Sequence, residues 1–563
     1  MSQPIPTAPD AANVADIAAC ASANAAAQAA AQKVLRIHPD DDMLVALDDL
    51  AMGEVVTDAG EQYLIATPVA RKHKFARRAF AEGEVLRLYG VPVGKAVRPI
   101  RRGEAVTTEN LAHYAAEVEL QATEPYTWTA PDVTRWDGAT FPGVVRKDGR
   151  VGTANYWLIF PLVFCENRNV EHLRNALERP LGYARDDLAA FTLSLLNEDM
   201  AAPAPAPRPF PNVDGVRMIT HAGGCGGTRA DARHLCKLLA AYADHPNVAG
   251  VTVFSLGCQN AQIAMFKEEL ARQNPDFDKP CLIYEQQKWE GGEPAMMQAV
   301  VRDTLAALAE ANRAQRTPVP LSHLKIGVKC GGSDGFSGIS ANPTMGLVSD
   351  MVVTLGGASI LAEFPELCGV EGDLIRRCVN DEDKRRFLGL MRDFEAKALA
   401  VGTHFADNPS PGNIRDGLIT DAMKSAGASK KGGSSPIVAV RDYGEPAPDQ
   451  GLSLLCTPGN DVESVTGIVA SGANVVLFST GLGTPTGNPI VPVLKIASNS
   501  RVAARLHDLI DFDCGPVIEG RPLPEVAGSL LDMVVATAGG QYQAKADRLQ
   551  QYDFLFWKRD ISL

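Results

Sequence analysis

The chain has 563 residues, a length that predicts two or three domains rather than one. Its composition, 46% hydrophobic and 21% charged, is typical of a globular protein with a sizeable core. The formal net charge of -13 argues against an electrostatic nucleic-acid surface. No stretch approaches the roughly 20 uninterrupted apolar residues that a membrane-spanning helix needs. We therefore expect a cytoplasmic protein that acts on small molecules and binds neither nucleic acid nor membrane.

The first 32 residues are rich in alanine and predict a poorly ordered extension. Asp10 and Asp16 stand where a signal peptide would carry positive charge, so this segment does not resemble a secretion signal. Cys20, within it, is interpreted as an incidental thiol. The eleven cysteines of the chain are an odd number and do not predict a disulfide framework without such a signal.

Residues 33–115 contain short alternating apolar runs separated by turns, which predicts a small β-rich domain. The adjacent His73 and Lys74 could supply a general base with a depressed pKa if they were partly buried. The alternative is a solvated basic turn, because four other cations surround them. His38, which precedes an acidic cluster, is a second candidate. Residues 116–145, with three prolines and no sustained period, predict a linker.

From residue 146 onward, predicted strands alternate with predicted helices, which indicates mainly parallel sheets. We place a first α/β lobe at 146–320 and a second at 321–563. Several apolar runs end in a cysteine followed by turn-forming residues, and the ends of parallel strands meet at one edge of a sheet. The cysteines in this position are Cys165, Cys225, Cys258, Cys330 and Cys456.

The loop Cys330 to Pro343, read as CGGSDGFSGISANP, joins a predicted strand to a predicted helix. Open α/β sheets bind ligands at such loops, although an ordinary glycine-rich turn is the alternative. No Walker A loop and no GxGxxG motif follows a strand, which disfavours a nucleotide-binding enzyme. Thiolates suit iron and zinc, but no CxxC pair is present, so any metal would take ligands from separate loops.

These loops resemble the altronate and galactarate dehydratase family over nearly the whole chain from about Lys33. The matching stretches are GRVGTANYWL, SLGCQN, KCGGSDGFSGISANP, EFPE, DNPSPGN, TPGND, FSTGLGTP and LKIASNS. KHKFA at 72–76 is similar to the Gly-His-Lys element of the family's SAF-type domain, with Lys72 in place of glycine. The arrangement looks closer to altronate dehydratase. The resemblance implies an α/β fold: a small β-rich SAF-type domain followed by a large α/β catalytic region.

The resemblance also implies a hydro-lyase that removes water from an aldonic or aldaric acid to give a 2-keto-3-deoxy acid. Family members are described as iron-dependent, so we expect Fe²⁺, with an iron-sulfur cluster as the alternative and Mn²⁺ as a possible substitute. The reaction takes the proton next to the carboxylate and expels the β-hydroxyl, a departure that a Lewis acid assists. The expected partner is a small sugar acid, and a homo-oligomer is possible.

Site residues carry over by position. Cys225, Cys258 and Cys330 are the expected metal ligands, with Cys165 as a fourth. His73 is the candidate base and Lys74 would polarise the carboxylate, with His38 and Asp41 beside them. The substrate pocket is expected to contain Asn155, His221, Ser333, Asp334, Asn342, Glu363 and Lys495.

Four positions depart from the family pattern: Ala154, Gly224, Leu482 and Thr486. At Ala154 and Leu482 the family commonly has arginine, and its loss removes bidentate recognition of a carboxylate. The substrate could therefore be a less charged or shorter hydroxy acid. Two alternatives follow: a lyase that expels another group, such as sulfite from a sulfolactate-type substrate, and a non-catalytic protein that binds sugar acids.

Overall fold

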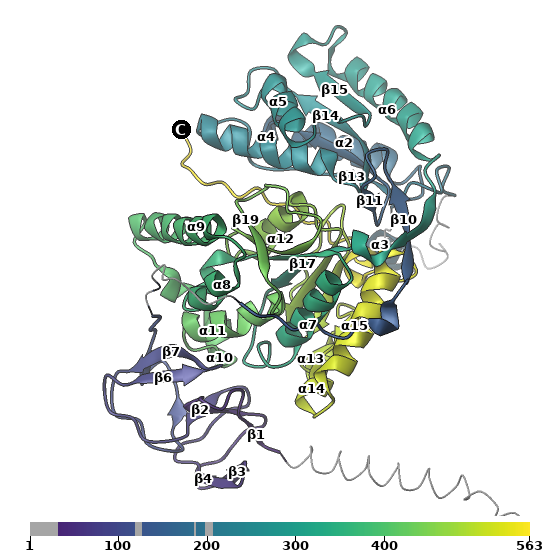
Figure 1. Ribbon diagram of the computed structural model, residues 1–563. Coiled ribbons are helices and arrows are strands. Elements are labelled where there is room, and N and C mark those ends of the chain that lie inside the picture. Colours follow the sequence, from purple (N-terminus) through teal and green to yellow (C-terminus); the bar gives the residue numbers. More distant parts are fainter. Residues whose placement is uncertain (1–31, 117, 119–125, 185–186, 197–206) are drawn as a thin grey trace, which may run out of the picture.

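The computed structural model describes residues 32–116, 118, 126–184, 187–196 and 207–563 (Figure 1). The extension expected at 1–32, with Cys20, lies outside these ranges apart from residue 32. The chain forms an N-terminal β domain, an α/β domain and a larger C-terminal α/β domain. In Figure 1 the β domain (purple) lies beside the C-terminal domain (green and yellow), on the side away from the second domain (teal).

The N-terminal domain consists of short antiparallel strands joined by turns, as its alternating sequence predicts. They form a four-stranded sheet in the order β1-β2-β5-β8, a three-stranded sheet β6-β7-β9 and a hairpin β3-β4. The strands are β1 (Val34–Leu35), β2 (Met43–Ala46), β3 (Val55–Asp58), β4 (Glu61–Leu64), β5 (Lys74–Ala76), β6 (Val85–Leu88), β7 (Val91–Ala96), β8 (Ala105–Val106) and β9 (Leu111–Ala112).

The second domain has a four-stranded parallel sheet in the order β13-β12-β14-β15. Its strands are β12 (Tyr156–Pro161), β13 (Gly215–Met218), β14 (Val248–Ser255) and β15 (Cys281–Glu285). Its helices are α2 (Asn167–Leu177), α3 (Asp187–Leu196), α4 (Arg229–Asp244), α5 (Ile263–Gln273) and α6 (Gly292–Ala311). The chain enters and leaves this domain through an antiparallel sheet of β10 (Thr140–Val145), β11 (Val151–Gly152) and β16 (Arg316–Pro320).

The C-terminal domain is built on a seven-stranded parallel sheet in the order β19-β20-β18-β17-β21-β22-β23. The chain begins at the central strand β17, proceeds to one edge and returns to add β21 on the other side of β17. The strands are β17 (Lys325–Cys330), β18 (Ala358–Leu361), β19 (Ile437–Arg441), β20 (Gly451–Leu455), β21 (Val475–Thr480), β22 (Val493–Ala497) and β23 (Phe512–Asp513).

Helices of the C-terminal domain cover both faces of this sheet (Figure 1). They are α7 (Ala341–Thr354), α8 (Glu371–Arg377), α9 (Asp381–Ala400), α10 (Pro411–Arg415), α11 (Asp421–Ala428), α12 (Asp461–Ala470), α13 (Ser500–Arg505), α14 (Gly515–Ile518), α15 (Leu523–Ala538) and α16 (Lys545–Arg548). The fold class expected from the sequence, a small β-rich domain followed by α/β units with parallel sheets, is confirmed.

The second and C-terminal domains share one apolar core. Side chains of α4 and β14 pack in the same cluster as those of α12 and β21. The hydroxyl of Tyr242 on α4 donates a hydrogen bond to the carbonyl oxygen of Thr466 on α12, at 3.3 Å. The end of the chain then runs back to the second domain, where Ser562 pairs with Gly227. The two α/β domains are therefore joined both by a shared apolar core and by the C-terminal segment.

Among the described residues, no helix combines the length and the apolar character that crossing a membrane requires.

Candidate active site

Cys330 lies at the topological switch point of the C-terminal sheet, where the order of successive strands reverses. It is the last residue of β17, whose neighbours β18 and β21 are reached by connections that leave in opposite directions. Such a point opens a crevice at the carboxyl ends of the strands, where open α/β folds bind their ligands. The loop 331–340 leads from this crevice into α7, as the sequence predicts. The fold thus places the Cys330 loop at the favoured ligand position of the larger sheet.

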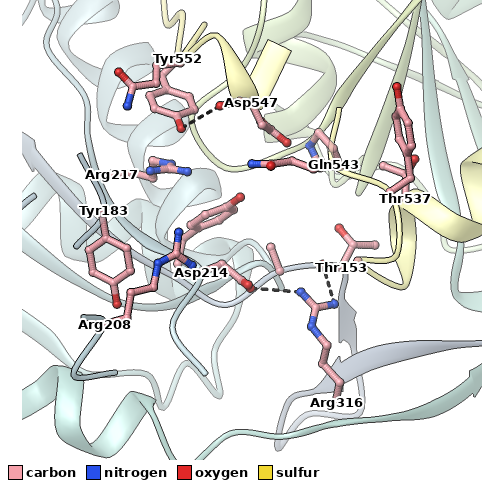
Figure 2. A pocket seen from close by; sticks show the side chains of 16 residues that line it. Thr153, Tyr183, Arg208, Asp214, Arg217, Arg316, Thr537, Gln543, Asp547 and Tyr552 are labelled. Carbon is pink, nitrogen blue, oxygen red and sulfur yellow. Dashed lines mark hydrogen bonds and ion pairs between the residues drawn. The ribbon is translucent and has the colours of Figure 1, made fainter. Parts of the chain in front are cut away.

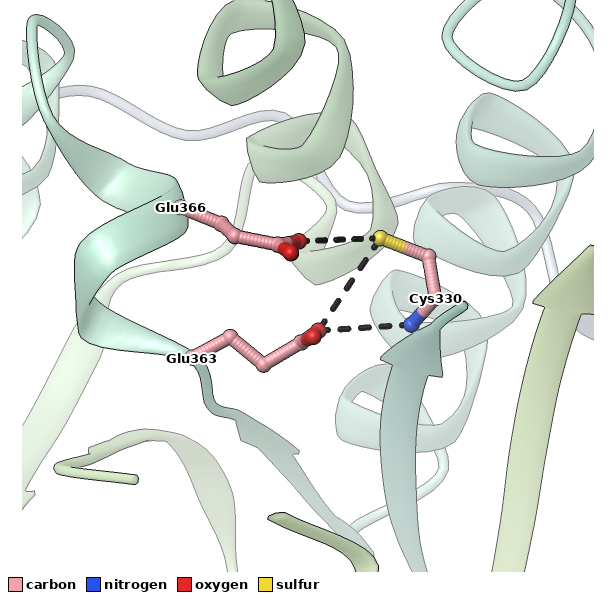
Figure 3. Close-up of side chains that lie close together, drawn as sticks. All are labelled: Cys330, Glu363 and Glu366. Carbon is pink, nitrogen blue, oxygen red and sulfur yellow. Dashed lines mark hydrogen bonds between the residues drawn. The ribbon is translucent and has the colours of Figure 1, made fainter. Parts of the chain in front are cut away.

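Two glutamates face the Cys330 thiol from the turn that follows β18 (Figure 3). The Sγ atom lies 3.4 Å from a carboxylate oxygen of Glu366 and 3.9 Å from one of Glu363. All three side chains are buried, and their ligand atoms lie within 4.8 Å of one another. In the described part of the chain, this is the one such group of three or more Cys, His, Asp or Glu side chains that could hold a metal ion.

The backbone at Glu363 adopts a left-handed conformation, with φ of +72°. Such angles are uncommon outside glycine and cost of order 1 kcal/mol or more, so the surrounding structure must hold this residue in place. Thr457 does so in part, because its hydroxyl accepts a hydrogen bond from the Glu363 N–H at 3.0 Å. The short 3₁₀ turn Phe364–Leu367 then brings Glu366 to the same side as Glu363.

Three lysines surround these acids. The ammonium of Lys431 lies 3.1 Å from the Cys330 sulfur and 2.6 Å from Glu363. Lys424 pairs with Glu366 at 2.8 Å, and Lys329 pairs with Glu363 and contacts Asp461 at 3.0 Å. Lys329 and Lys431 are completely buried. Buried charges persist only when they are paired, and here cations and acids neutralise each other within one network.

The network sets the protonation states of its members. Burial raises the pKa of the Cys330 thiol to about 12, against the opposing effect of Lys431, so the thiol keeps its proton at neutral pH. Burial and the neighbouring Glu366 likewise raise the pKa of Glu363. Burial alone would raise the pKa of Glu366, but Lys424, Lys329 and Lys431 lower it to about 2. Glu366 is therefore a carboxylate at physiological pH.

The network opens into a pocket of about 500 Å³. Cys330 lines it together with the charged side chains of Glu366 and Lys424. The rest of the wall is polar apart from Leu482, and it includes Gly331, Gly332, Ser333, Asn408, Ser410, Asn413, Gly459, Asn460 and Asp461. Amides, hydroxyls and an ammonium are suited to a small ligand that carries hydroxyls and a carboxylate.

Comparison with known proteins identifies the family. The chain matches the D-galactarate/altronate dehydratase C-terminal domain over residues 321–562, the D-galactarate dehydratase/altronate hydrolase second domain over 143–312, and the altronate/galactarate dehydratase SAF domain over 32–114. Altronate dehydratase of Escherichia coli (strain K12) is 33% identical, over 94% of this chain and 99% of that protein. The chain belongs to the altronate/galactarate dehydratase family.

Two further relatives agree with this assignment. Altronate dehydratase of Bacillus subtilis (strain 168) is 32% identical, over 90% of this chain and 95% of that protein. Galactarate dehydratase (L-threo-forming) of Escherichia coli (strain K12) is 30% identical, over 91% of this chain and 94% of that protein. The expected enzyme class, a carbon-oxygen lyase, and the expected SAF domain are confirmed.

The SAF domain of this dehydratase-family chain contacts the C-terminal domain next to the Cys330 pocket. The Lys72 ammonium lies 3.0 Å from Asp334 and 2.6 Å from Asp416. The ring nitrogen Nε2 of His73 is 2.9 Å from the carbonyl oxygen of Arg415, and Lys74 donates to the carbonyl oxygen of Gly417 at 2.6 Å. Arg415 ends α10, the helix that supplies Asn413 to the pocket wall.

Burial changes the acidity of both predicted catalytic residues of this segment. It lowers the pKa of His73, so the ring is neutral at pH 7. It also lowers the pKa of the fully buried Lys74 to about 7. Two basic groups with lowered pKa values are suited to proton transfer near neutrality. Their role as base and polarising group stays a prediction.

His38 and Asp41 lie together within the SAF domain. The Asp41 carboxylate is buried and accepts backbone N–H bonds from His38 and Gly90, both at 2.9 Å. The His38 ring packs against Gly90, and its side chain is 46% exposed. Both residues thus shape a turn at the edge of the domain, and neither lines the Cys330 pocket.

The three other predicted thiol ligands occupy the carboxyl edge of the second domain's sheet. Cys165, Cys225 and Cys258 lie on the loops after β12, β13 and β14, and all three are exposed. Backbone hydrogen bonds join these loops: Phe164 donates to Gly223 at 3.1 Å, and Ala261 donates to Gly224 at 3.0 Å. Convergence at one sheet edge follows the sequence argument. Cys330, however, belongs to the other sheet and has Glu363 and Glu366 as its close acidic neighbours.

The predicted substrate-pocket residues are distributed over both α/β domains. Ser333 lines the Cys330 pocket, and its hydroxyl has no protein partner among the described residues. Asp334 is buried next to it and accepts hydrogen bonds from the Ser337 and Ser498 hydroxyls. Asn342 is bonded to Ser479 and to the Gly427 carbonyl oxygen. Asp334 and Asn342 therefore hold the Cys330 loop in place through buried hydrogen bonds.

The remaining predicted residues lie away from the pocket wall. Asn155 binds Arg146 and two backbone carbonyl groups, while His221 bridges the Pro161 carbonyl oxygen and the Gly223 N–H. Lys495 is fully buried with its ammonium 4.2 Å from the centre of the Phe478 ring, and this ammonium has no hydrogen-bond partner among the described residues. Burial lowers the pKa of Lys495 to about 7.

Sequence reasoning missed Glu366 and the three lysines. The matched stretch EFPE contains both glutamates, and their spacing of three would place them on one side of a short turn. Lys329 precedes Cys330 directly and could have been suspected for that reason. Lys424 and Lys431 lie about 100 residues further on, in and after α11, and no motif marks them.

Proposed function

We propose that the Cys330 pocket catalyses the dehydration of a sugar acid, an altronate-like aldonate, to a 2-keto-3-deoxy acid. The observation that carries this proposal is the buried group of Cys330, Glu363 and Glu366 at the floor of a polar pocket, compensated by three lysines. Membership of the dehydratase family supports the reaction class. The polar wall supports a ligand rich in hydroxyl groups.

The substrate carboxylate would be bound by the ammonium group of Lys424, the lysine that lines the pocket. Lys424 lines the pocket and is held by Glu366 and by the Asn408 amide oxygen, at 2.5 Å. The amides of Asn408 and Asn413 and the hydroxyl of Ser410 would bind substrate hydroxyls. Leu482 offers no charge where the family resemblance led us to expect arginine. This supports a substrate with one carboxylate, an aldonate, over one with two.

Removal of the proton next to the carboxylate requires a neutral or anionic base. His73, which contacts the end of α10 and is not among the residues that line the pocket, meets this chemical requirement, because a neutral ring that donates from Nε2 to the Arg415 carbonyl oxygen keeps a lone pair on Nδ1. Lys74, whose pKa burial lowers to about 7, is the next residue and begins β5, and its charge would change the basicity of Nδ1. Glu366, a carboxylate within the pocket, is the alternative base.

Loss of the β-hydroxyl requires charge neutralisation. Cys330, Glu363 and Glu366 offer one sulfur and two carboxylate oxygens, a donor set that fits iron(II). When bound there, the metal would supply Lewis acidity toward the leaving oxygen. The Cys330 thiol would have to give up its proton, and Lys431 would have to move from the sulfur. The buried Lys329 and Lys431 would then balance the carboxylates, and Lys424, which lines the pocket, would bind the developing negative charge.

The thiols of the second domain form the competing metal set. Cys165, Cys225 and Cys258 share one sheet edge and are exposed, and thiolates are the usual ligands of an iron-sulfur cluster, but in the described part of the chain their sulfur atoms do not form a close group like the one at Cys330. They remain candidates for a second, separate metal position.

The test is a panel of aldonic and aldaric acids, incubated anaerobically with enzyme and ferrous iron, with detection of 2-keto-3-deoxy product. We expect turnover of a C6 aldonate and at least a 100-fold loss in the Cys330→Ser variant. A Cys514→Ser variant, which changes a buried thiol away from the pocket, is the matched control. Absence of product from every acid would contradict the proposal and would favour a binding protein. Release of sulfite from a sulfonated acid would point to the alternative lyase.

A further inference from the structure

A second polar cavity lies between the second and C-terminal domains, separate from the Cys330 pocket. Its volume is about 310 Å³, and it shares no lining residue with the Cys330 pocket. Figure 2 shows the guanidinium groups of Arg217 and Arg316 and the side chain of Gln543 extending into the same space. Strands β12, β13 and β16 and the segments around α16 supply the wall. Anything bound here would touch both domains.

Arg217 is the central feature of this cavity. The side chain is only 7% exposed, and its guanidinium lies between two aromatic rings, 4.7 Å from Tyr156 and 4.0 Å from Tyr552. Its Nε–H donates to the carbonyl oxygen of Pro489 at 3.1 Å. Within the described ranges, no protein acceptor binds either terminal nitrogen. A fixed, buried guanidinium with unused donors is a site for an oxyanion.

Two further guanidinium groups border the same space. Arg316 is held by the Thr153 carbonyl oxygen at 2.9 Å and by Asp214 at 3.1 Å. Arg208 lies over the Tyr183 ring at 5.2 Å. Asp214 balances one of these three positive charges. The local excess of positive charge favours an anionic ligand.

The opposite side of the cavity adds groups that bind hydroxyls. Gln543 presents an amide, which can both donate and accept. Asp547 is the acid on this side, and burial raises its pKa to about 7, opposed by Arg217. A carboxyl group whose pKa is raised in this way repels an anion less than an ordinary carboxylate does.

We propose that this cavity binds a small hydroxylated anion, with a carboxylate or phosphate group on Arg217 and hydroxyl groups toward Gln543. The ligand joins the two α/β domains and stabilises their contact by mass action. Ala154 is 5% exposed and forms part of the wall. Its small side chain leaves the space that the ligand takes.

The experiment is calorimetric titration of the full chain with D-gluconate and, separately, with inorganic phosphate. We expect binding of at least one probe, weakened tenfold or more by Ala154→Leu, which fills the cavity, and by Gln543→Ala, which removes the amide. Lys424→Met alters the Cys330 pocket and serves as the reference for binding there. A cooperative thermal unfolding transition of each variant, recorded without gluconate or phosphate, shows that the variant is folded.

Two results would overturn the proposal. One is binding that both cavity variants leave unchanged, and the other is binding that Lys424→Met alone abolishes. Gluconate binding without phosphate binding identifies the carboxylate as the recognised group, and the reverse identifies phosphate. Dehydratase turnover is measured in parallel, so that failure of the proposed reaction and failure of this binding site are distinguishable.

Discussion

The ammonium nitrogen of Lys431 lies 3.1 Å from the sulfur of Cys330, although 101 residues separate the two in the chain. The same nitrogen is 2.6 Å from Glu363, and both side chains of that ion pair are fully buried. The lysine therefore neutralises a carboxylate and faces a thiol without contact with bulk water. This geometry makes Lys431 a stabilising residue as well as a part of the site.

Replacing Lys431 by methionine leaves the Glu363 carboxylate short of one buried counter-ion. We expect a loss of about 3–5 kcal/mol in the free energy of unfolding, measured by urea denaturation. Adding Glu363→Gln to this variant restores part of the loss, because the uncompensated charge is removed. Lys147→Met, which breaks an ion pair with an 83% exposed lysine side chain, is expected to cost below about 1 kcal/mol. Equal costs at the two lysines would contradict the network.

The metal content of anaerobically prepared protein separates the two candidate ligand sets. We expect iron in the parent protein and its loss in Cys330→Ala and in Glu366→Gln, because each removes one of three close ligand atoms. Cys258→Ala, which alters the exposed sheet-edge set, is expected to keep the metal bound at Cys330. Metal analysis of the four proteins by mass spectrometry provides the measurement. Loss of iron in Cys258→Ala with retention in Cys330→Ala would assign the metal to the second domain.

His221 predicts a dependence of stability on pH. Burial lowers its pKa to about 4, so the folded protein keeps the ring neutral while the unfolded chain, with a pKa near 6.5, takes up a proton. Stability therefore rises with pH between about 4 and 6.5. This histidine contributes about 3 kcal/mol above that window, which is lost as the pH falls through it.

Melting temperatures from pH 5 to pH 7 measure this effect. The His221→Gln variant can still accept from Gly223 and donate to Pro161, and it does not titrate. We expect its melting temperature to fall less steeply with acidification than that of the parent. His172→Gln, at an exposed position, is expected to follow the parent curve. A parallel shift of the His221→Gln curve at every pH would refute the prediction.

Lys72 combines an unfavourable backbone with a favourable charge. Its φ is +76°, where glycine is relaxed, and its ammonium joins Asp334 and Asp416 across the domain contact. Lys72→Gly relieves strain of about 1 kcal/mol but leaves the buried Asp334 without its cation. We expect net destabilisation of about 1–3 kcal/mol in chemical denaturation. Ala59→Gly, at an exposed turn with φ of +46°, is expected to be neutral or stabilising.

The parallel sheets were predictable because each strand is an apolar run that ends in small polar residues. The run ending at Cys330 and the following helical pattern lie within a few residues of β17 and α7. The convergence of the Cys165, Cys225 and Cys258 loops also follows from this rule. Strand order does not, because sequence spacing does not tell which strand of a parallel sheet pairs with which. The lobe boundary at 320/321 already separated Cys330 from the other three thiols, whereas the family resemblance grouped all four as one ligand set.

The network of acids and lysines around Cys330 shows a second limit of prediction from the sequence. EFPE marks Glu363 and Glu366 by local spacing, but their partners Lys424 and Lys431 come from a helix and turn with no distinctive pattern. Pairing across such separations depends on how α11 packs beside the turn after β18. Arg217 is a second example. Its position in the sequence indicates an ordinary strand residue, and only the fold shows that the Tyr552 ring packs on its guanidinium.

The shared core of the second and C-terminal domains has a consequence for modularity. Helix α4 buries Leu238, Leu239 and Tyr242 in a cluster that also contains Ile468 of α12 and Phe478 of β21. A fragment cut between the two units would expose these apolar faces to water on both sides. We therefore expect the pair to fold as one cooperative unit, and we expect an exchange of one domain at β16 to destabilise the protein. A single unfolding transition for residues 143–562 is the expected result in calorimetry.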